Sequence, residues 1–224
     1  GYFTDGSEIR LTQEMRESAF GAASVFADMN NDGALDIVKQ TSLNPPQHVA
    51  ITYNDPSNKG WFNDYHIVDQ NAPYFVSVDD LNGDGKYDLV IVDDAVDSYY
   101  INTGTGLDGR CTFDYYTLPP ETNDFGGNSW ISDLDQDGRK DIIITDVDVD
   151  ISGCSRSTHL LFNTGQSEGD LFQRDSSGIS EDDLNGVHDV AVFDLDGDGW
   201  EDIVLGTCNG MTVWMADPQE VVSF

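Results

Sequence analysis

The sequence has few basic residues and no long apolar run. Its 224 residues contain 10 lysines and arginines against 42 aspartates and glutamates, which gives a formal net charge of −32. Binding to nucleic acid or directly to an anionic membrane requires clustered basic side chains, so neither is expected. Without an apolar run of about 18 residues, no membrane-spanning helix is expected either. The start, Gly1 to Gly6, does not resemble a signal peptide, and we interpret the chain as a mature or excised piece of a longer secreted protein.

Recognisable catalytic and metal-thiolate motifs are also absent. The three cysteines, Cys111, Cys154 and Cys208, are too few for a disulfide scaffold and form no CxxC pair. The four histidines show no HExxH spacing, and there is no GxSxG motif and no glycine-rich phosphate loop before a helix. We therefore expect a protein that is not an enzyme. With 38% hydrophobic and 11% aromatic residues, the chain has enough apolar side chains to form a core.

The sequence does contain one acidic motif four times. The four stretches start at Asp28 (DMNNDGALDIV), Asp80 (DLNGDGKYDLV), Asp133 (DLDQDGRKDII) and Asp194 (DLDGDGWEDIV), and successive starts are 52, 53 and 61 residues apart. All four obey D-x-[DN]-x-D-G-x-x-D followed by two aliphatic residues. Recurrence at a period of about 50 residues indicates a repeat protein.

The spacing of oxygen-bearing residues predicts a calcium site in each motif. Positions 1, 3, 5 and 9 supply side-chain oxygens, position 7 supplies a backbone carbonyl, and the glycine at position 6 permits a sharp bend. Several anionic oxygens without histidine or cysteine suit Ca²⁺ better than zinc or copper. An EF-hand is excluded, because position 12 holds no glutamate and strand-like segments flank each motif. Without a cation, the carboxylates of one turn would repel one another.

Strand-like segments around the motifs predict an all-β fold. One segment precedes each acidic turn, a second follows it, and a third and, in three units, a fourth come next. Four strands in a unit of about 50 residues are typical of a β-propeller blade, so we predict a β-propeller of four-stranded antiparallel blades. The four repeats cover approximately residues 20–70, 71–119, 124–177 and 185–224 of a single domain, 1–224. Residues 1–14 are interpreted as a last strand that closes the fourth blade.

These units resemble FG-GAP/VCBS repeats, a family that includes the propeller of integrin α subunits, fungal propeller lectins and many secreted bacterial proteins. The resemblance rests on the acidic turn, the four-stranded units and a Phe-Gly pair at Phe20-Gly21 and Phe125-Gly126, which the second and fourth units lack. It implies about four Ca²⁺ ions. The implied side-chain ligands are Asp28, Asn30, Asp32, Asp36, Asp80, Asn82, Asp84, Asp88, Asp133, Asp135, Asp137, Asp141, Asp194, Asp196, Asp198 and Asp202, and the carbonyl ligands are Ala34, Lys86, Arg139 and Trp200.

Two ring arrangements remain open at this point. Propellers of this family usually have seven blades, and this chain supplies four. The chain is therefore either a four-blade part of a seven-bladed propeller or a closed four-bladed ring, in which the segment near Tyr2 lies beside Val213.

A second set of residues predicts a ligand rim on the face opposite the acidic turns. By resemblance to integrins, partners bind on that face. The expected rim residues are Asp93, Asp94, Asp97, Asp146, Asp148, Asp150, Trp130 and His188. Cys154 and Cys208 fall in equivalent loops of neighbouring units, so a disulfide bond between them is expected.

Together these features indicate a secreted or cell-surface, calcium-stabilised β-propeller module that mediates adhesion or ligand recognition in the extracellular space. The expected partner is a carbohydrate or protein ligand, along with further blades or domains of the same parent protein. Two alternatives remain. One is the propeller domain of a lyase- or dehydratase-like enzyme that processes polysaccharides or sugars, and the other is a purely structural assembly module.

Overall fold

The strands of the chain form four antiparallel sheets. The computed structural model describes residues 2–17, 21–41, 48–71, 73–123, 127–145, 156–175, 178–180 and 182–217. Each sheet lies within one sequence repeat, and we refer to the sheets as blades one to four. In every blade, strands that are consecutive in sequence are hydrogen-bonded neighbours.

The blades have the following strands. Blade one contains β1 (Gly21–Ala27), β2 (Asp36–Thr41), β3 (His48–Asn54) and β4 (Phe62–Asp69). Blade two contains β5 (Pro73–Asp79), β6 (Asp88–Asp93), β7 (Ser98–Thr105) and β8 (Cys111–Thr117). Blade three contains β9 (Asn128–Ser132), β10 (Asp141–Thr145), β11 (Thr158–Asn163) and β12 (Phe172–Arg174). Blade four has three strands among the described residues: β13 (Val187–Phe193), β14 (Asp202–Thr207) and β15 (Gly210–Trp214).

Each acidic turn joins the first two strands of its blade. Ala27 pairs with Asp36 in blade one, and Phe193 pairs with Asp202 in blade four, so the turns close their hairpins in the same register. The second strand of each blade begins at the last aspartate of the motif. In blade two all six residues of this strand, β6, are buried, as expected for a β-branched strand covered on both faces.

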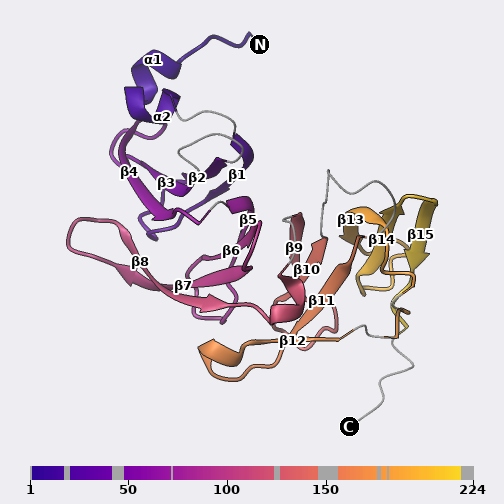
Figure 1. Ribbon diagram of the computed structural model, residues 1–224. Helices are drawn as coiled ribbons and strands as arrows, with labels where there is room; N and C mark the ends of the chain where they lie inside the picture. The colour runs from indigo at the N-terminus through magenta and orange to yellow at the C-terminus, as the bar shows by residue number, and fades with distance from the viewer. Residues whose placement is uncertain are drawn as a thin grey trace.

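The blades follow one another in chain order around an arc (Figure 1), and their first strands β1, β5, β9 and β13 contact each other in sequence. Three hydrophobic clusters form the core, one between each pair of neighbouring blades. Between blades one and two, for example, Val38 and Ile51 pack with Leu89 and Ile91. This architecture is all-β and propeller-like. The described sheets do not close into a ring.

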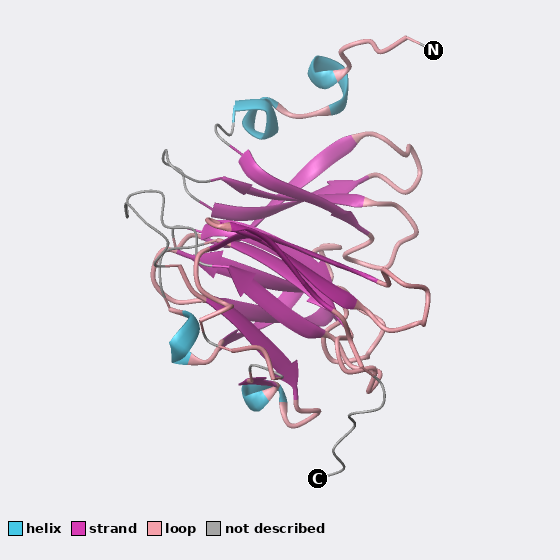
Figure 2. Ribbon diagram, turned by 90° about the vertical axis from the view of Figure 1, so that its right-hand side faces the viewer, coloured by secondary structure: helices cyan, strands magenta, loops and turns pink. Residues whose placement is uncertain are grey.

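The strand expected in residues 1–14 is not formed. This segment instead contains two short helices, α1 (Ser7–Arg10) and α2 (Gln13–Glu17), which lie beside blade one in Figure 2. The sequence here is rich in Glu, Arg, Gln and Met, which are good helix formers. Arg10 fixes the segment by donating from Nη1 to the Gly60 carbonyl at 2.9 Å, and its guanidinium lies 5.8 Å from the Trp61 ring centroid.

The remaining helices are single 3₁₀ turns, η1 (Pro120–Thr122) and η2 (Glu168–Asp170). No helix in the described ranges is long and apolar enough to cross a membrane.

Candidate metal sites and an interblade cleft

A buried aspartate at position 9 anchors each acidic turn. These residues are Asp36, Asp88, Asp141 and Asp202, all at most 1% exposed. In each case one carboxylate oxygen accepts the N–H of position 2 and the other accepts an N–H at the end of the third strand. For Asp88 the donors are Leu81 and Asn102, both at 2.8 Å. The carboxylate therefore ties the turn to the third strand of its own blade.

Burial makes three of these carboxylates, those of Asp36, Asp88 and Asp141, difficult to ionise. Loss of hydration raises the pKa of Asp36 and Asp141 to about 6 and that of Asp88 to about 7. Asp80 and Asp84 lie at positions 1 and 5 of the same turn as Asp88. Their negative charges repel the Asp88 carboxylate and raise its pKa further. A bound cation would favour the ionised form by the same electrostatics.

The aspartate at position 1 of a turn accepts backbone N–H bonds from later residues of the same turn. In the fourth turn, Asp194 Oδ1 accepts the N–H of Gly197 at 2.7 Å, and Oδ2 accepts that of Gly199 at 3.0 Å. Position 4 has a positive φ in all four turns: 56° at Asn31 and Gln136, 74° at Gly83 and 82° at Gly197. The left-handed residue and the side-chain bonds turn the chain sharply enough for the carboxylates to converge.

The third and fourth turns gather their carboxylates most closely. Carboxylate oxygens of Asp133, Asp135 and Asp141 lie within 4.8 Å of one another, and so do those of Asp194, Asp196 and Asp202. Asp133 Oδ1 is buried and has no hydrogen-bond donor among the described residues. In the first and second turns position 3 is Asn30 or Asn82, so fewer of these positions carry charge. These clusters can bind a metal ion, and their all-oxygen donors fit Ca²⁺.

The same hydrogen bond joins position 7 to position 5 in all four turns. The N–H of position 7 donates to the position 5 carboxylate, at 2.9 Å for Ala34, Lys86 and Arg139 and at 2.8 Å for Trp200. The acceptors are Asp32, Asp84, Asp137 and Asp198. The carbonyl ligands implied at position 7 remain predictions.

A recurring asparagine at the end of the third strand was missed by the sequence reasoning. Asn54, Asn102 and Asn163 each donate their N–H to the position 9 aspartate, and Ala216 does so in blade four. The side-chain amides of two of these asparagines also bond the preceding blade. Asn102 Nδ2 donates to Met29 O in blade one at 2.9 Å, and Asn163 Nδ2 donates to Leu81 O in blade two at 2.8 Å. The repeated asparagine in TYND, YINTG and LFNTG was the available signal.

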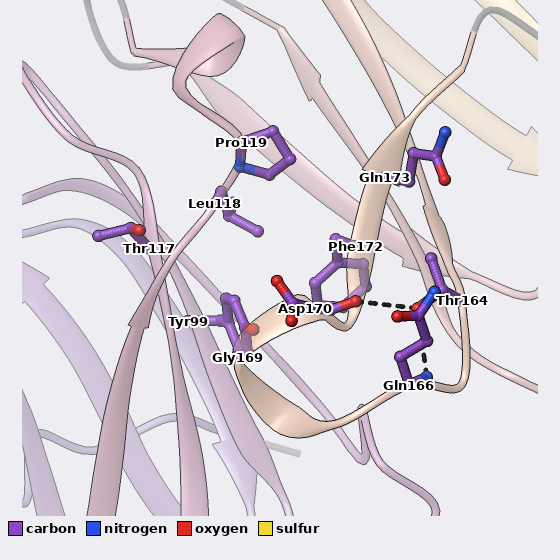
Figure 3. A pocket seen from close by; sticks show the side chains of 10 residues that line it. All are labelled: Tyr99, Thr117, Leu118, Pro119, Thr164, Gln166, Gly169, Asp170, Phe172 and Gln173. Atoms are coloured by element: carbon purple, nitrogen blue, oxygen red, sulfur yellow. Dashed lines mark hydrogen bonds between the residues drawn. The ribbon is translucent and has the colours of Figure 1, made fainter.

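A cleft of about 330 Å³ lies between blades two and three (Figure 3). Buried aromatic rings form its floor: Tyr99 and Phe172 meet edge to face, with ring centroids 5.2 Å apart. Polar and exposed side chains surround the floor, including Gln166, Asp170 and Gln173. The cleft thus combines an apolar surface with amide, hydroxyl and carboxylate groups, and Figure 3 shows these groups around Phe172.

The third acidic turn holds one wall of this cleft. Asp141 Oδ1 accepts the N–H of Asn163 at 2.8 Å, and Arg139 Nε donates to the Asn163 carbonyl at 2.7 Å. Asn163 Oδ1 in turn accepts the N–H of Gly165 at 3.0 Å. The next residue, Gln166, lines the cleft and donates its N–H to Thr164 Oγ1 at 3.2 Å. A few hydrogen bonds therefore connect the acidic turn to the cleft wall.

The expected ligand rim is only partly described. Asp93 and Asp97 are buried, and their carboxylates accept backbone N–H bonds within their own turn, so they shape that turn. Asp94 is exposed in the same turn. Trp130, 43% exposed, lies on β9 and lines a hollow of about 600 Å³ with residues of β1 and β5. Asp146, Asp148 and Asp150 lie outside the described residues, as do Phe20 and Phe125-Gly126.

The expected disulfide bond is not seen. Cys208 is an exposed free thiol, and Cys154 lies outside the described residues. The Cys208 sulfur is 3.1 Å from Nε2 of His188, the last of the expected rim residues, which is exposed on β13.

The sequence matches the FG-GAP-like repeat over residues 80–144 and 133–205, more than half of the chain. The chain belongs to the FG-GAP-like repeat family. A comparison with curated proteins gives no match. The matched region contains the second, third and fourth acidic turns, so the FG-GAP-like assignment and the recurring hairpins describe the same segments.

A solved lectin structure supports the fold of this FG-GAP-like chain. An Agrocybe aegerita lectin, described as recognising non-reducing terminal N-acetylglucosamine, aligns with a TM-score of 0.52 and 22% identity. The alignment covers 82% of this chain and 46% of the lectin, so the chain spans less than half the lectin's length. A Photorhabdus luminescens Tc holotoxin pore aligns with a TM-score of 0.41 and 16% identity, over 89% of this chain and 11% of that one.

Proposed function

We propose that this chain is an extracellular, calcium-binding recognition module whose ligand is a carbohydrate bound in the cleft between blades two and three. The observation that carries the proposal is the bonded connection from the third acidic turn, through Asp141 and Asn163, to the cleft wall at Gln166. Because of this connection, metal binding and ligand binding should be coupled.

Calcium would be held by the side chains at positions 1, 3, 5 and 9 of each turn and by the carbonyl of position 7. When bound, it supplies positive charge that neutralises carboxylates which otherwise repel one another. The orphaned oxygen of Asp133 and the raised pKa of Asp141 support this assignment for the third turn. Four equivalent turns predict about four ions, with a structural role in each blade.

The cleft has the chemistry that sugars require. Saccharides present an apolar face of C–H groups and an edge of hydroxyl groups that both donate and accept hydrogen bonds. Partly exposed Pro119 and the mostly buried Phe172 line the cleft with apolar atoms for the C–H face. Gln166, Gln173 and Asp170 offer donors and acceptors for the hydroxyl groups. A volume of about 330 Å³ is at the small end of ligand pockets, which suits one or two sugar rings. The lectin of similar fold makes carbohydrate the first ligand class to test.

The test is a glycan array probed with the chain in millimolar calcium and again in EDTA, followed by titration of the best glycan. We expect binding in calcium and its loss in EDTA. Asp170→Asn should weaken binding at least tenfold, whereas Asp108→Asn, in the corresponding turn of blade two, should not. A blank array with folded protein would refute carbohydrate recognition and would favour a protein ligand for the module.

A matched pair of acidic-turn variants tests the coupling. Asp137→Asn changes position 5 of the third turn, and this turn is hydrogen-bonded to the cleft wall. Asp32→Asn changes position 5 of the first turn, which does not contribute to the cleft. Asp137→Asn should raise the calcium concentration needed for glycan binding, and Asp32→Asn should leave it unchanged. Equal effects of both variants would show that calcium acts only through overall stability.

A further inference from the structure

The exposed thiol of Cys208 lies in a cluster with His188 and Arg156, where blades three and four meet. Arg156 Nη1 is 2.5 Å from Nδ1 of His188, and Nε2 of His188 is 3.1 Å from the Cys208 sulfur. The three residues come from different segments: Arg156 precedes β11, His188 lies on β13 and Cys208 follows β14. All three lie outside the acidic turns and outside the lining of the cleft between blades two and three.

Backbone hydrogen bonds through Gly186 hold the three segments together. The N–H of Gly186 donates to the Arg156 carbonyl at 2.8 Å, and its carbonyl accepts the N–H of Cys208 at 2.9 Å. The pairing of β13 with β14 also shifts its register at His188. A bulge in an antiparallel pair re-aims a side chain. The backbone of three segments therefore places the guanidinium, the imidazole and the thiol next to one another.

The arginine fixes the order of donors and acceptors in the cluster. A guanidinium has N–H donors and no acceptor, so Nδ1 of His188 accepts from Arg156. A neutral imidazole whose Nδ1 accepts carries its proton on Nε2, and this N–H donates to the Cys208 sulfur. A thiolate accepts such a bond more strongly than a thiol does. The contact therefore favours the nucleophilic form of the cysteine.

The Cys208 sulfur is also accessible. Cys208 is exposed, and it forms with Asn209 the two-residue turn between β14 and β15. Cys111 provides the contrast, because it is 1% exposed and its sulfur donates to the Met29 carbonyl. Reactive cysteines are accessible and lie beside histidine or arginine, whereas buried cysteines are inert. Only the first description fits Cys208.

We propose that Cys208 is a modification site that forms mixed disulfides with small organic disulfides. The Cys208 thiolate, having released its proton to water, attacks one sulfur of the disulfide, and a new bond joins that sulfur to Sγ. The sulfur–sulfur bond of the reagent breaks, and its electron pair leaves on the second sulfur, which takes up a proton from water. The reagent is the oxidant and leaves as one thiol. His188 and Arg156 are positioning residues that stabilise the thiolate. The proposal does not depend on calcium or sugar binding.

The test follows the reaction of the folded chain with dithiodipyridine at pH 7 by the absorbance of the released thiopyridone. Peptide mass spectrometry identifies the modified cysteine. We expect the mixed disulfide on Cys208, formed about tenfold faster in the folded chain than in urea, because unfolding removes the His188 donor. A folded chain that reacts no faster than the unfolded chain would overturn the proposal. Peptide mapping of the unreduced chain that finds Cys208 already joined in a disulfide within the chain would overturn it as well.

Variants of the cluster and a matched control locate the cause. His188→Ala should lower the rate in the folded chain to that of the unfolded chain. Arg156→Met should lower it in part, since Nδ1 can then hold the imidazole proton, and Arg156→Lys, which keeps a charged donor, should restore most of the rate. The control Arg174→Gln removes a similar contact, from Arg174 Nε to Nδ1 of His159 at 3.0 Å, and should leave the rate unchanged.

Urea unfolding verifies the fold of each variant. A folded His188→Ala chain that reacts as fast as the native chain would refute the assignment, and so would an equal loss of rate in Arg174→Gln. If His188→Ala does not fold, Arg156→Met and Arg156→Lys decide the question, because equal rates in these two variants and the native chain would refute the role of the cluster.

Discussion

Three of the position 9 aspartates, Asp36, Asp88 and Asp141, make the stability of the calcium-free chain fall as the pH rises. Asp88 has no exposed surface, and burial raises its pKa from 3.8 to about 7. Below pH 3.8 the folded and unfolded chains are both protonated at this residue. Between about pH 4 and pH 7 the unfolded chain has lost this proton and the folded chain keeps it, so unfolding becomes more favourable as the pH rises. Above about pH 7 both states are ionised and the effect is complete.

The rise in the pKa of Asp88 from 3.8 to about 7 corresponds to about 4 kcal/mol of unfolding free energy, of which about 3 kcal/mol falls above pH 5. Asp36 and Asp141, with pKa values of about 6, act in the same direction. A domain is typically stable by about 5–15 kcal/mol, so these losses are large enough to unfold a calcium-free chain near neutral pH.

The assay is urea unfolding at intervals from pH 5 to pH 8, followed by tryptophan fluorescence, in EDTA and in millimolar calcium. In EDTA the native chain should lose stability as the pH rises, and Asp88→Asn should lose about 3 kcal/mol less over this range because residue 88 no longer titrates. Calcium should restore stability most at pH 7 to 8. A native chain and an Asp88→Asn variant with the same pH slope in EDTA would refute the reasoning.

Three further outcomes follow from individual contacts. Asn163→Ala removes a buried amide bonded to two carbonyls and one N–H, so it should lower the unfolding free energy by about 2–3 kcal/mol in urea titrations and weaken glycan binding. Asp64→Ala removes a half-exposed ion pair with Arg110 across blades one and two, so it should cost at most about 1 kcal/mol, and less in high salt. A thiol reagent should label exposed Cys208 in the native chain and leave buried Cys111 unlabelled, as peptide mass spectrometry would report.

Local sequence was sufficient to predict the acidic hairpins. The turn from Asp80 to Asp88 contains its own glycines, its own hydrogen-bond acceptors and the start of an apolar strand, so its structure depends on residues close in sequence. Reasoning from the repeat pattern was wrong for residues 1–14. There a polar segment with strong helix propensity was assigned to a strand because the repeat pattern required one at that place, and α1 and α2 show that propensity prevailed.

The cleft could not be predicted from the sequence, because blade stacking creates it. Tyr99 and Phe172 are far apart in sequence and meet only when blade three packs on blade two. The acidic residues at the end of β6 show the same limit. The sequence did not indicate that the carboxylates of Asp93 and Asp97 accept backbone N–H bonds in a tight turn, and their place in a ligand rim stays a prediction.

The acidic turn, the stacking of blades and the cleft depend on the same few groups. Asp141 bonds the N–H of Asn163, whose amide bonds the carbonyl of Leu81 in the neighbouring blade and the N–H of Gly165 at the cleft wall. A change of charge in the turn should therefore affect both the packing of blade three on blade two and the position of the cleft wall. Blade four has Ala216 at the equivalent place, so its turn bonds the third strand but cannot reach the blade before it by an amide. The link between turn and neighbouring blade is thus a property of particular repeats. Among the described residues Asn102 makes it between blades one and two, and Asn163 makes it between blades two and three, beside the cleft.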